Sequence, residues 1–274
     1  MTQELLEVTP TQQSTDVSAS LPFPFKTFCR YEPIAQRIEK ARVLVIDNLL
    51  RDERDVSEVA RKEWGNSVAV ELKRERLIAG MAIENILSNI SRLVKDPETY
   101  VAHVSELAEA AAEFQPQAIV LSGTLRDFDY YNESILEDFG RFIRETKIPV
   151  LAICGGHQLV GMSFGARVVT LDKLEQHEQR LERPHEYQYR YVRITEPDDP
   201  IFTNIAVDET PVDESDSRKA SHILHVWQNH GLQLDRVPEG FALLATSYLC
   251  RNQMMVKRSE GQLIYTVQFH LEKS

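Results

Sequence analysis

Four short segments with strand-like patterns, separated by segments with helical periodicity, constrain the fold of this chain more than any other feature. They lie at residues 41–50, 67–72, 117–123 and 148–154. Short segments rich in Val, Ile and Leu are typical of strands buried on both faces of a parallel sheet. Because these strands alternate with helices, the sequence predicts an α/β fold with an open, mostly parallel sheet and helices on both faces.

Apolar residues recur at helical spacing between these strands. The pattern predicts helices over residues 76–96 and 97–114, with the break at Pro97, and a third helix over 133–146. A fourth helix is expected directly after Cys154. The predicted apolar face of the third helix comprises Ile135, Leu136, Phe139, Phe142 and Ile143.

The C-terminal half has a different pattern. Residues 171–222 are highly charged, and we expect antiparallel strands there together with a solvated acidic loop over 207–216. Three further strands are predicted at residues 241–248, 253–258 and 263–270.

The N-terminal residues differ from both halves. Residues 1–20 are polar and are expected to be disordered, and the Pro-rich residues 21–25 are expected to form an extended arm. The predicted organisation is therefore a tail and arm over residues 1–40, followed by a single domain over residues 41–274.

Charge and cysteine content exclude several classes of protein. The net charge is −11, so nucleic acid is not an expected partner. The three cysteines are too few and too scattered for a disulfide framework or a cysteine zinc cluster, and we expect a reducing cytoplasm and no metal. The N-terminus lacks the pattern of a signal peptide, and no apolar run approaches the ~18 residues of a membrane span.

Cys154 lies in the segment "VLAICGGHQLVG" over residues 150–161, at a position suited to a reactive side chain. Ligands of open α/β sheets bind at the carboxyl ends of the strands, where this cysteine is predicted to lie. A strand-to-helix turn can present such a residue in a strained conformation, provided that its neighbours are small, as Ala152 and Gly156 are. The following helix favours the thiolate. On this segment alone, a nucleophile and an ordinary buried cysteine both remain open.

Neighbouring glycines do not indicate a nucleotide site. Gly156 and Gly161 have the spacing of a phosphate-binding loop, but Met162 stands where the lysine is required.

A base and its orienting group lie at the other end of the chain. A nucleophilic cysteine needs a base, and the base needs a partner that fixes its orientation. His270 and Glu272 are two residues apart at the end of the last predicted strand, so their side chains point the same way.

Four segments together resemble the class I glutamine amidotransferases, the type with a Cys-His-Glu triad. In chain order they are "IVLSGTLRD", "AICGGHQ", "VWQNHGLQLDRVPEGFALLATS" and "VQFHLE", and this order and their spacing are those of the family. The third segment is similar to the amidotransferase parts of GMP synthetase and carbamoyl-phosphate synthetase. The resemblance covers residues 41 to 274 and implies the flavodoxin-like fold of the family.

This resemblance implies a mechanism. Cys154 attacks the side-chain amide of L-glutamine and forms a glutamyl thioester. His270 protonates the departing ammonia and then activates water, while Glu272 holds the imidazole. The implied oxyanion hole is formed by backbone N–H groups of Gly155 and of the loop at Gly123 and Thr124.

The resemblance also implies how substrate and partner are bound. Glutamine is contacted by the side chain of Gln158 and by the backbone around Asn229, His230 and Gly231. No cofactor is expected. Because no acceptor-activating domain is visible, the ammonia is expected to pass to a separate synthetase chain or to be released.

Several features depart from the family pattern. Thr124 replaces the usual second glycine of its loop, and Leu271 replaces the usual proline between histidine and glutamate. The segments over residues 50–116 and 171–222 are longer than usual, so they could dock a partner or cover the site.

Other possibilities stay open at this point. The same triad would serve a standalone hydrolase of γ-glutamyl compounds, and the fold would serve a non-catalytic binding protein. His222 and His225 would suit a metal only in a helix, while His177 and His185 are expected to be solvated. Cys29 and Cys250 are expected to be structural.

Overall fold

The computed structural model describes residues 36–203, 208–211 and 220–273. The predictions of a polar tail and a Pro-rich arm fall almost entirely on residues 1–35, outside the described residues, as does Cys29. Most of the predicted acidic loop lies outside them as well. Of the helices in the described part of the chain, none is both long enough and apolar enough to span a membrane.

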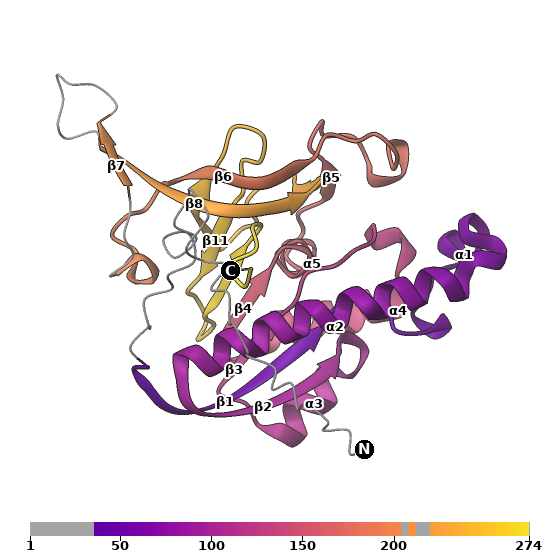
Figure 1. The fold of residues 1–274 in the computed structure, drawn as a ribbon, viewed down its shortest axis with the longest axis horizontal. Coiled ribbons are helices and arrows are strands. Elements are labelled where there is room, and N and C mark those ends of the chain that lie inside the picture. Colours follow the sequence, from indigo (N-terminus) through magenta and orange to yellow (C-terminus); the bar gives the residue numbers. More distant parts are fainter. Residues whose placement is uncertain (1–35, 204–207, 212–219, 274) are drawn as a thin grey trace, which may run out of the picture. The chain divides into compact units, whose positions relative to one another are not determined.

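Ten of the described strands form one sheet, which is parallel in one half and antiparallel in the other (Figure 1). The parallel half confirms the predicted fold class. In spatial order it consists of β2 (Val94–His103), β1 (Ile38–Asp47), β3 (Ala118–Leu121), β4 (Val150–Ile153) and β12 (Ile264–Val267).

The antiparallel half continues from β12. It consists of β11 (Met254–Lys257), β10 (Phe241–Thr246), β6 (Glu186–Ile194), β8 (Ala220–His230) and β7 (Asp208–Pro211). Strands β6 and β7, with the start of β8, confirm the antiparallel strands predicted in the charged segment. The predicted acidic loop over 207–216 is wrong at residues 208–211, which pair with β8 as strand β7. A separate antiparallel pair joins β5 (Val168–Thr170) to β9 (Leu232–Leu234).

Helices cover both faces of the parallel half. Alternate residues of β1 point to opposite faces: Val43 and Val45 pack with helix α2, and Leu44 and Ile46 pack in the core that contains α3, α4 and α5. The helices are α1 (Glu58–Trp64), α2 (Val68–Leu93), α3 (Leu107–Phe114), α4 (Glu133–Glu145) and α5 (Gly155–Ser163). Short 3₁₀ turns lie at Glu53–Asp55, Gly65–Ser67, Val104–Glu106, Phe128–Tyr130, Gln176–Glu178 and Pro200–Phe202.

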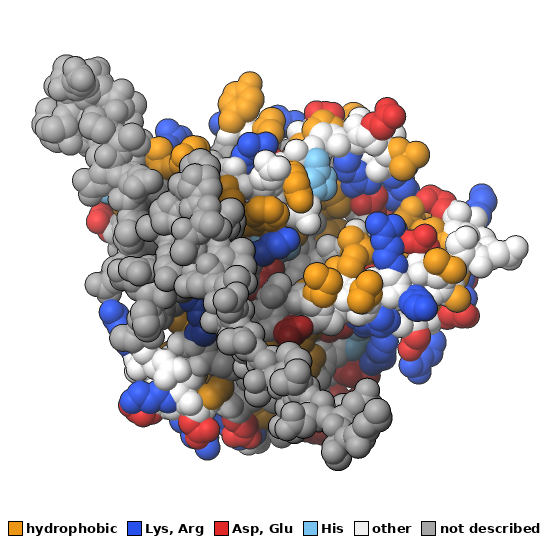
Figure 2. All heavy atoms as spheres, in the orientation of Figure 1, with side chains coloured by type: hydrophobic (Ala, Val, Ile, Leu, Met, Phe, Trp, Pro, Cys, Tyr) orange, Lys and Arg blue, Asp and Glu red, His pale blue; other side chains and the backbone are white. Residues whose placement is uncertain are grey.

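The predicted strand over residues 67–72 is wrong, because Ser67 ends a 3₁₀ turn and helix α2 begins at Val68. Val70, which the alternating pattern places on a buried face, is 67% exposed. The buried positions of the helix instead recur at intervals of three or four residues or their multiples. They are Leu72, Glu75, Ala79, Ile86 and Ile90. Figure 2 shows hydrophobic side chains gathered over this helix, whose exposed apolar residues include Leu77 and Met81.

The predicted helix over residues 97–114 is wrong in its first half. Residues 94–103 form strand β2, parallel to β1, and only Leu107–Phe114 is α-helical. Strand β2 is the edge strand of the sheet, where a proline such as Pro97 costs least because one side of the strand is unpaired.

The predicted helix over residues 133–146 is confirmed as α4. Ile135, Phe139 and Ile143 are buried, and Leu136 and Phe142 pack partly buried against the same core. This helix and α5 cover the face of the sheet opposite α2. Because the strands of this half are parallel, their carboxyl ends lie together at one edge of the sheet.

Candidate functional site

Cys154 lies at the turn between β4 and α5, as predicted. Its backbone has φ 50° and ψ −107°, a conformation that a residue with a side chain rarely adopts. The Cys154 N–H donates to the carbonyl of Val267 on β12 at 2.7 Å, and its carbonyl accepts from Gln158 N at 3.2 Å. Sheet and helix therefore both hold the strained residue.

The neighbours of this turn have no room for larger side chains. Ala152 has no exposed surface. A Cβ atom on Gly156 would lie 2.9 Å from the carbonyl oxygen of Ser122 and 3.0 Å from Leu121 Cβ. The crowding predicted on both sides of the cysteine is confirmed.

Substitution Gly156→Ala is expected to destabilise the protein by about 1–3 kcal/mol, because its methyl group meets a fixed backbone carbonyl. The free energy of unfolding in urea measures this change. Gly80→Ala is the matched control: Gly80 lies within α2 with open space around it, so alanine should stabilise the helix by about 0.5–1 kcal/mol. Equal changes in both variants would show that the turn is not crowded.

His270 and Glu272 form a hydrogen-bonded pair that converges on this cysteine. Nδ1 of His270 lies 2.7 Å from Oε1 of Glu272. The loop residue Gly123 shows the convergence, because a Cβ atom there would lie 3.6 Å from His270 Cε1 and 3.9 Å from Cys154 Sγ. The backbone of the pair is fixed by β8, through His270 N–H and the Trp227 carbonyl at 2.9 Å, and by Asn89 of α2.

Electrostatics favour a charged imidazole at this position. Burial opposes the charge of His270, but the Cys154 sulfur and the Glu272 carboxylate outweigh it and raise the pKa of His270 to about 10. His157, which is nearer in sequence, is buried and bonded to Thr266 Oγ1, and burial together with His230 lowers its pKa to about 3. His270 is therefore the histidine suited to accompany a thiolate.

A cavity of about 470 Å³ brings together nine of the ten predicted site residues. The tenth, Gly155, adjoins it, since a Cβ atom on Gly155 would overlap the backbone nitrogen and Oγ1 of Thr124. Residue 155 must therefore be glycine for its backbone to approach the loop this closely. The nine are Gly123, Thr124, Cys154, Gln158, Asn229, His230, Gly231, His270 and Glu272.

Gln158 is held by protein groups on one side of the cavity. Its amide nitrogen donates to the carbonyl of Leu232 and to Oε1 of Gln268, both at 3.0 Å. Gln268 is fully buried, and its own amide nitrogen points to Cys154 Sγ at 3.8 Å. Sequence reasoning missed Gln268, although it lies in "VQFH", two residues before the histidine.

The Gln268→Met variant is expected to slow alkylation of Cys154 by iodoacetamide at neutral pH by about tenfold. Methionine keeps the volume but removes a donor that stabilises charge on sulfur, and such bonds contribute ~1.5 kcal/mol or more. The alkylation rate, read by mass spectrometry, measures the loss. Gln262→Met, at a buried glutamine that donates to backbone carbonyls near residue 144, is the control. An unchanged rate in Gln268→Met would show that the 3.8 Å contact does not affect the sulfur.

Both long segments cover the cavity. Ile78 and Ala82 of α2 line one wall, and Arg180, Leu181 and Arg183 line another. His185 also lines it and contacts Asn229 Oδ1 at 3.1 Å, although it is exposed as expected.

Ion pairs anchor the second of these segments. Arg183 donates both terminal nitrogens to Asp127, at 2.7 and 2.9 Å, and Arg180 donates to Asp127 and Asp129, at 2.8 and 2.6 Å. Asp127 belongs to the loop that follows β3. The charged segment therefore closes over the site through contacts with the loop that carries Gly123 and Thr124.

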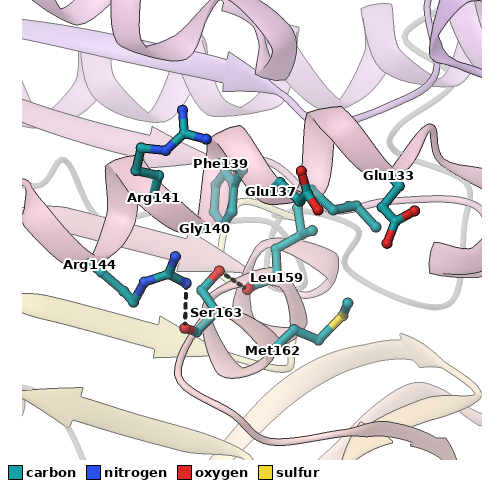
Figure 3. A pocket seen from close by; sticks show the side chains of 10 residues that line it. Glu133, Glu137, Phe139, Gly140, Arg141, Arg144, Leu159, Met162 and Ser163 are labelled. Carbon is teal, nitrogen blue, oxygen red and sulfur yellow. Dashed lines mark hydrogen bonds between the residues drawn. The ribbon is translucent and has the colours of Figure 1, made fainter.

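A second cavity, of about 490 Å³, lies between α4 and α5 and contains none of the predicted site residues (Figure 3). Arg144 and Ser163 close one end, because Arg144 donates to the Ser163 carbonyl at 2.9 Å. Leu159 and Met162 form part of its wall.

The remaining candidates are resolved by the fold. His222 and His225 lie in strand β8, not in a helix, so three residues of separation place them on opposite faces. Cys250 is fully buried, and burial, with the Glu186 carboxylate, raises the pKa of its thiol well above the usual range. His177 is exposed, as expected.

The fold and the site define a class of protein: an open α/β enzyme with a strained cysteine at a strand-to-helix turn and a His-Glu pair beside it. The family model of glutamine amidotransferase class I matches residues 81–274. The chain therefore belongs to the class I glutamine amidotransferases and is an enzyme of that family.

Individual relatives agree with this assignment. The GMP synthase (glutamine-hydrolysing) of Alteromonas mediterranea is 29% identical over 168 residues, and that of Pelodictyon phaeoclathratiforme is 32% identical over 171 residues. Each match covers 60% of this chain but only 27% of the relative. A glutamine amidotransferase structure from Thermotoga maritima shares the fold, with a TM-score of 0.51 and 19% identity, over 85% of this chain and 76% of that one.

Proposed function

We propose that this enzyme hydrolyses the side-chain amide of L-glutamine through a thioester on Cys154. The observation that carries the proposal is the convergence of the strained cysteine and the His270–Glu272 pair on the backbone of Gly123. A buried cysteine without a functional role needs neither the strained backbone nor a charged histidine beside it.

The first half of the reaction uses the thiolate and the imidazolium together. The thiolate attacks the amide carbon, and the N–H groups of Gly155 and of the loop at Thr124 stabilise the resulting oxyanion. Each such donor contributes roughly 3 kcal/mol to lowering the barrier. His270 then transfers its Nε2 proton to the departing nitrogen, the C–N bond breaks, and ammonia leaves a glutamyl thioester.

The second half regenerates the enzyme. Neutral His270 takes a proton from water, and the hydroxide attacks the thioester carbon. The C–S bond breaks, so glutamate is released and the thiolate–imidazolium pair forms again. Glu272 accepts the Nδ1 hydrogen throughout, which keeps Nε2 directed at the reacting atoms.

We further propose that the ammonia passes to a separate synthetase chain. The relatives are named glutamine-hydrolysing GMP synthases, and the match spans little more than a quarter of their length. As part of the same proposal, the acceptor reaction is assigned to another polypeptide. We place the reaction in the cytoplasm, where Cys154 stays reduced.

A second candidate function is hydrolysis of larger γ-glutamyl compounds. The observation that favours it is the cavity, in which side chains from both long segments add to the wall around the triad. A substrate with a longer leaving group would contact these additional walls.

Assays with the two substrate classes separate the candidates. The purified chain is given glutamine or γ-glutamyl dipeptides, with and without cell extract, and ammonia or amino acid release is measured. Weak glutaminase activity that rises with a co-purifying protein supports ammonia transfer. Strong cleavage of γ-glutamyl peptides without glutamine turnover would overturn the leading proposal. Failure of a glutamine-analogue electrophile to label Cys154 would overturn both.

A further inference from the structure

Three potential metal ligands meet at the edge of the cavity, outside the triad, and one of them, His230, also lines the cavity. Glu186 begins β6, His230 ends β8, and Cys250 lies between β10 and β11. Their ligand atoms all lie within 4.8 Å of one another, and at most 4% of any of the three residues is exposed. No metal is expected from the sequence, because the three cysteines are too few and too scattered for a cysteine zinc cluster.

The hydrogen bonding of His230 leaves one ring nitrogen facing an acceptor. Nδ1 lies 2.9 Å from the carbonyl oxygen of Leu232, which can only accept, so Nδ1 carries the hydrogen. In the neutral ring Nε2 then has a lone pair. It lies 3.0 Å from Oε2 of Glu186, yet the two atoms form no hydrogen bond. Two electron-rich atoms thus face each other in a buried site, which is unfavourable without a cation.

A proton on His230 would satisfy this pair, but it would give no role to the third group. The Cys250 thiol donates to the carbonyl of Asn252 at 3.5 Å, and its sulfur lies within 4.8 Å of the ligand atoms of His230 and Glu186. Nitrogen, sulfur and carboxylate oxygen are the donors that proteins use for zinc. We propose that Glu186, His230 and Cys250 bind a divalent transition metal of the zinc class.

The surroundings match those of a metal site. Histidine ligands typically donate their other ring N–H to a carbonyl or carboxylate, as His230 does to Leu232. The Glu186 carboxylate accepts from Gln253 at 2.9 Å and from Ser247 at 3.3 Å, which fixes its orientation. Oε1 of Gln228, two residues before His230 on the same face of β8, is also buried without a hydrogen-bond partner among the described residues.

The metal has a structural role that goes beyond the proposed glutaminase chemistry. The carbonyl of Leu232 accepts from both His230 and Gln158, so a fixed His230 also fixes the glutamine-binding side of the cavity. The thiol of Cys250 gives its proton to solvent when the metal binds, and no electron is transferred.

Metal binding is tested in the Cys154→Ala background, because the triad is itself a Cys-His-Glu set. The protein is dialysed against chelator and then titrated with zinc, and native mass spectrometry reads the bound metal. We expect one equivalent of zinc and a raised melting temperature. Cys154→Ala/Cys250→Ser and Cys154→Ala/Glu186→Gln should each bind at least tenfold more weakly. Cys154→Ala/His225→Gln, at an exposed histidine of the same strand, should bind as the parent does.

A spectroscopic measurement keeps the proposal falsifiable if a variant fails to fold. Cobalt(II) added to the Cys154→Ala protein should show a thiolate-to-metal charge-transfer band. Absence of one bound equivalent, or absence of this band in the folded protein, would overturn the proposal. A doubly protonated His230 in the nitrogen NMR spectrum, with zinc present, would assign the site to a buried ion pair instead. These readouts do not depend on glutamine turnover, so failure of the proposed function leaves the metal site testable.

Discussion

The Cys154→Ala variant is expected to lose glutamine hydrolysis by at least ~10⁴-fold, the scale on which removal of a triad residue acts. The oxyanion donors and the cavity remain, but no nucleophile faces the substrate carbon. Ammonia release, followed with a coupled assay, measures the loss. Cys29→Ala is the matched control, since it removes a thiol that neither the proposed mechanism nor the proposed metal site uses. Residual turnover above one-hundredth of the parent rate would show that Cys154 is not the nucleophile.

The same position also carries a prediction about stability. At φ 50° and ψ −107°, a Cβ atom is strained and glycine is not, so Cys154→Gly should be about 1–2 kcal/mol more stable than Cys154→Ala. Urea unfolding of the two inactive variants measures the difference. Gln115→Gly, at an ordinary left-handed helix end with φ 48° and ψ 60°, should gain less than Cys154→Gly does. Equal stability of the alanine and glycine variants at position 154 would show that the turn holds no strain.

Local pattern was sufficient to predict the centre of the fold and of the site. The apolar centres of strands β1, β3 and β4 lie within the predicted segments, although β1 begins three residues earlier and ends three residues earlier than predicted, at Ile38 and Asp47. Cys154, His270 and Glu272 could be found because each lies at the end of such a strand, where side chains leave the sheet. Their proximity follows from parallel pairing of β4 with β12, which aligns the two carboxyl ends.

Elements at the margin of the fold could not be predicted in this way. Strand β2 contains Pro97 and several exposed residues, so only its place at the sheet edge makes it a strand. The start of α2 alternates as a strand does, and only packing of Leu72 and later residues against the core shows its helical period. Tertiary position outweighs local preference in both segments.

Contacts between distant segments could not be predicted from the sequence either. Asp127 pairs with Arg180 and Arg183 across more than fifty residues, and no local period records that pairing. Gln268, in contrast, lies in the segment that identifies the triad. Its role is recognised only in the structure, where its buried amide nitrogen points to Cys154 Sγ. The charged segment thus carries residues of the cavity wall, although its composition resembles that of solvated surface.

The Glu272→Gln variant is expected to lower kcat/KM for glutamine by about 10⁴-fold at neutral pH. The Glu272 carboxylate accepts the Nδ1 hydrogen of His270 at 2.7 Å and so directs Nε2 at the cysteine. A glutamine amide can present its NH₂ group to Nδ1, which stabilises the opposite tautomer. Glu239→Gln, at an exposed glutamate outside the cavity, makes the same change in net charge and should leave kcat/KM unchanged.

The pH profile distinguishes an electrostatic role of Glu272 from a purely structural one. Burial lowers the pKa of His270, while the sulfur of Cys154 and the carboxylate of Glu272 raise it to about 10. Loss of the acid form should therefore limit the parent enzyme only near pH 10. In Glu272→Gln one of the raising contributions is gone, so the alkaline limb of kcat/KM should move to lower pH. A tenfold or smaller loss of activity with an unmoved limb would mean that Glu272 neither orients His270 nor holds its charge.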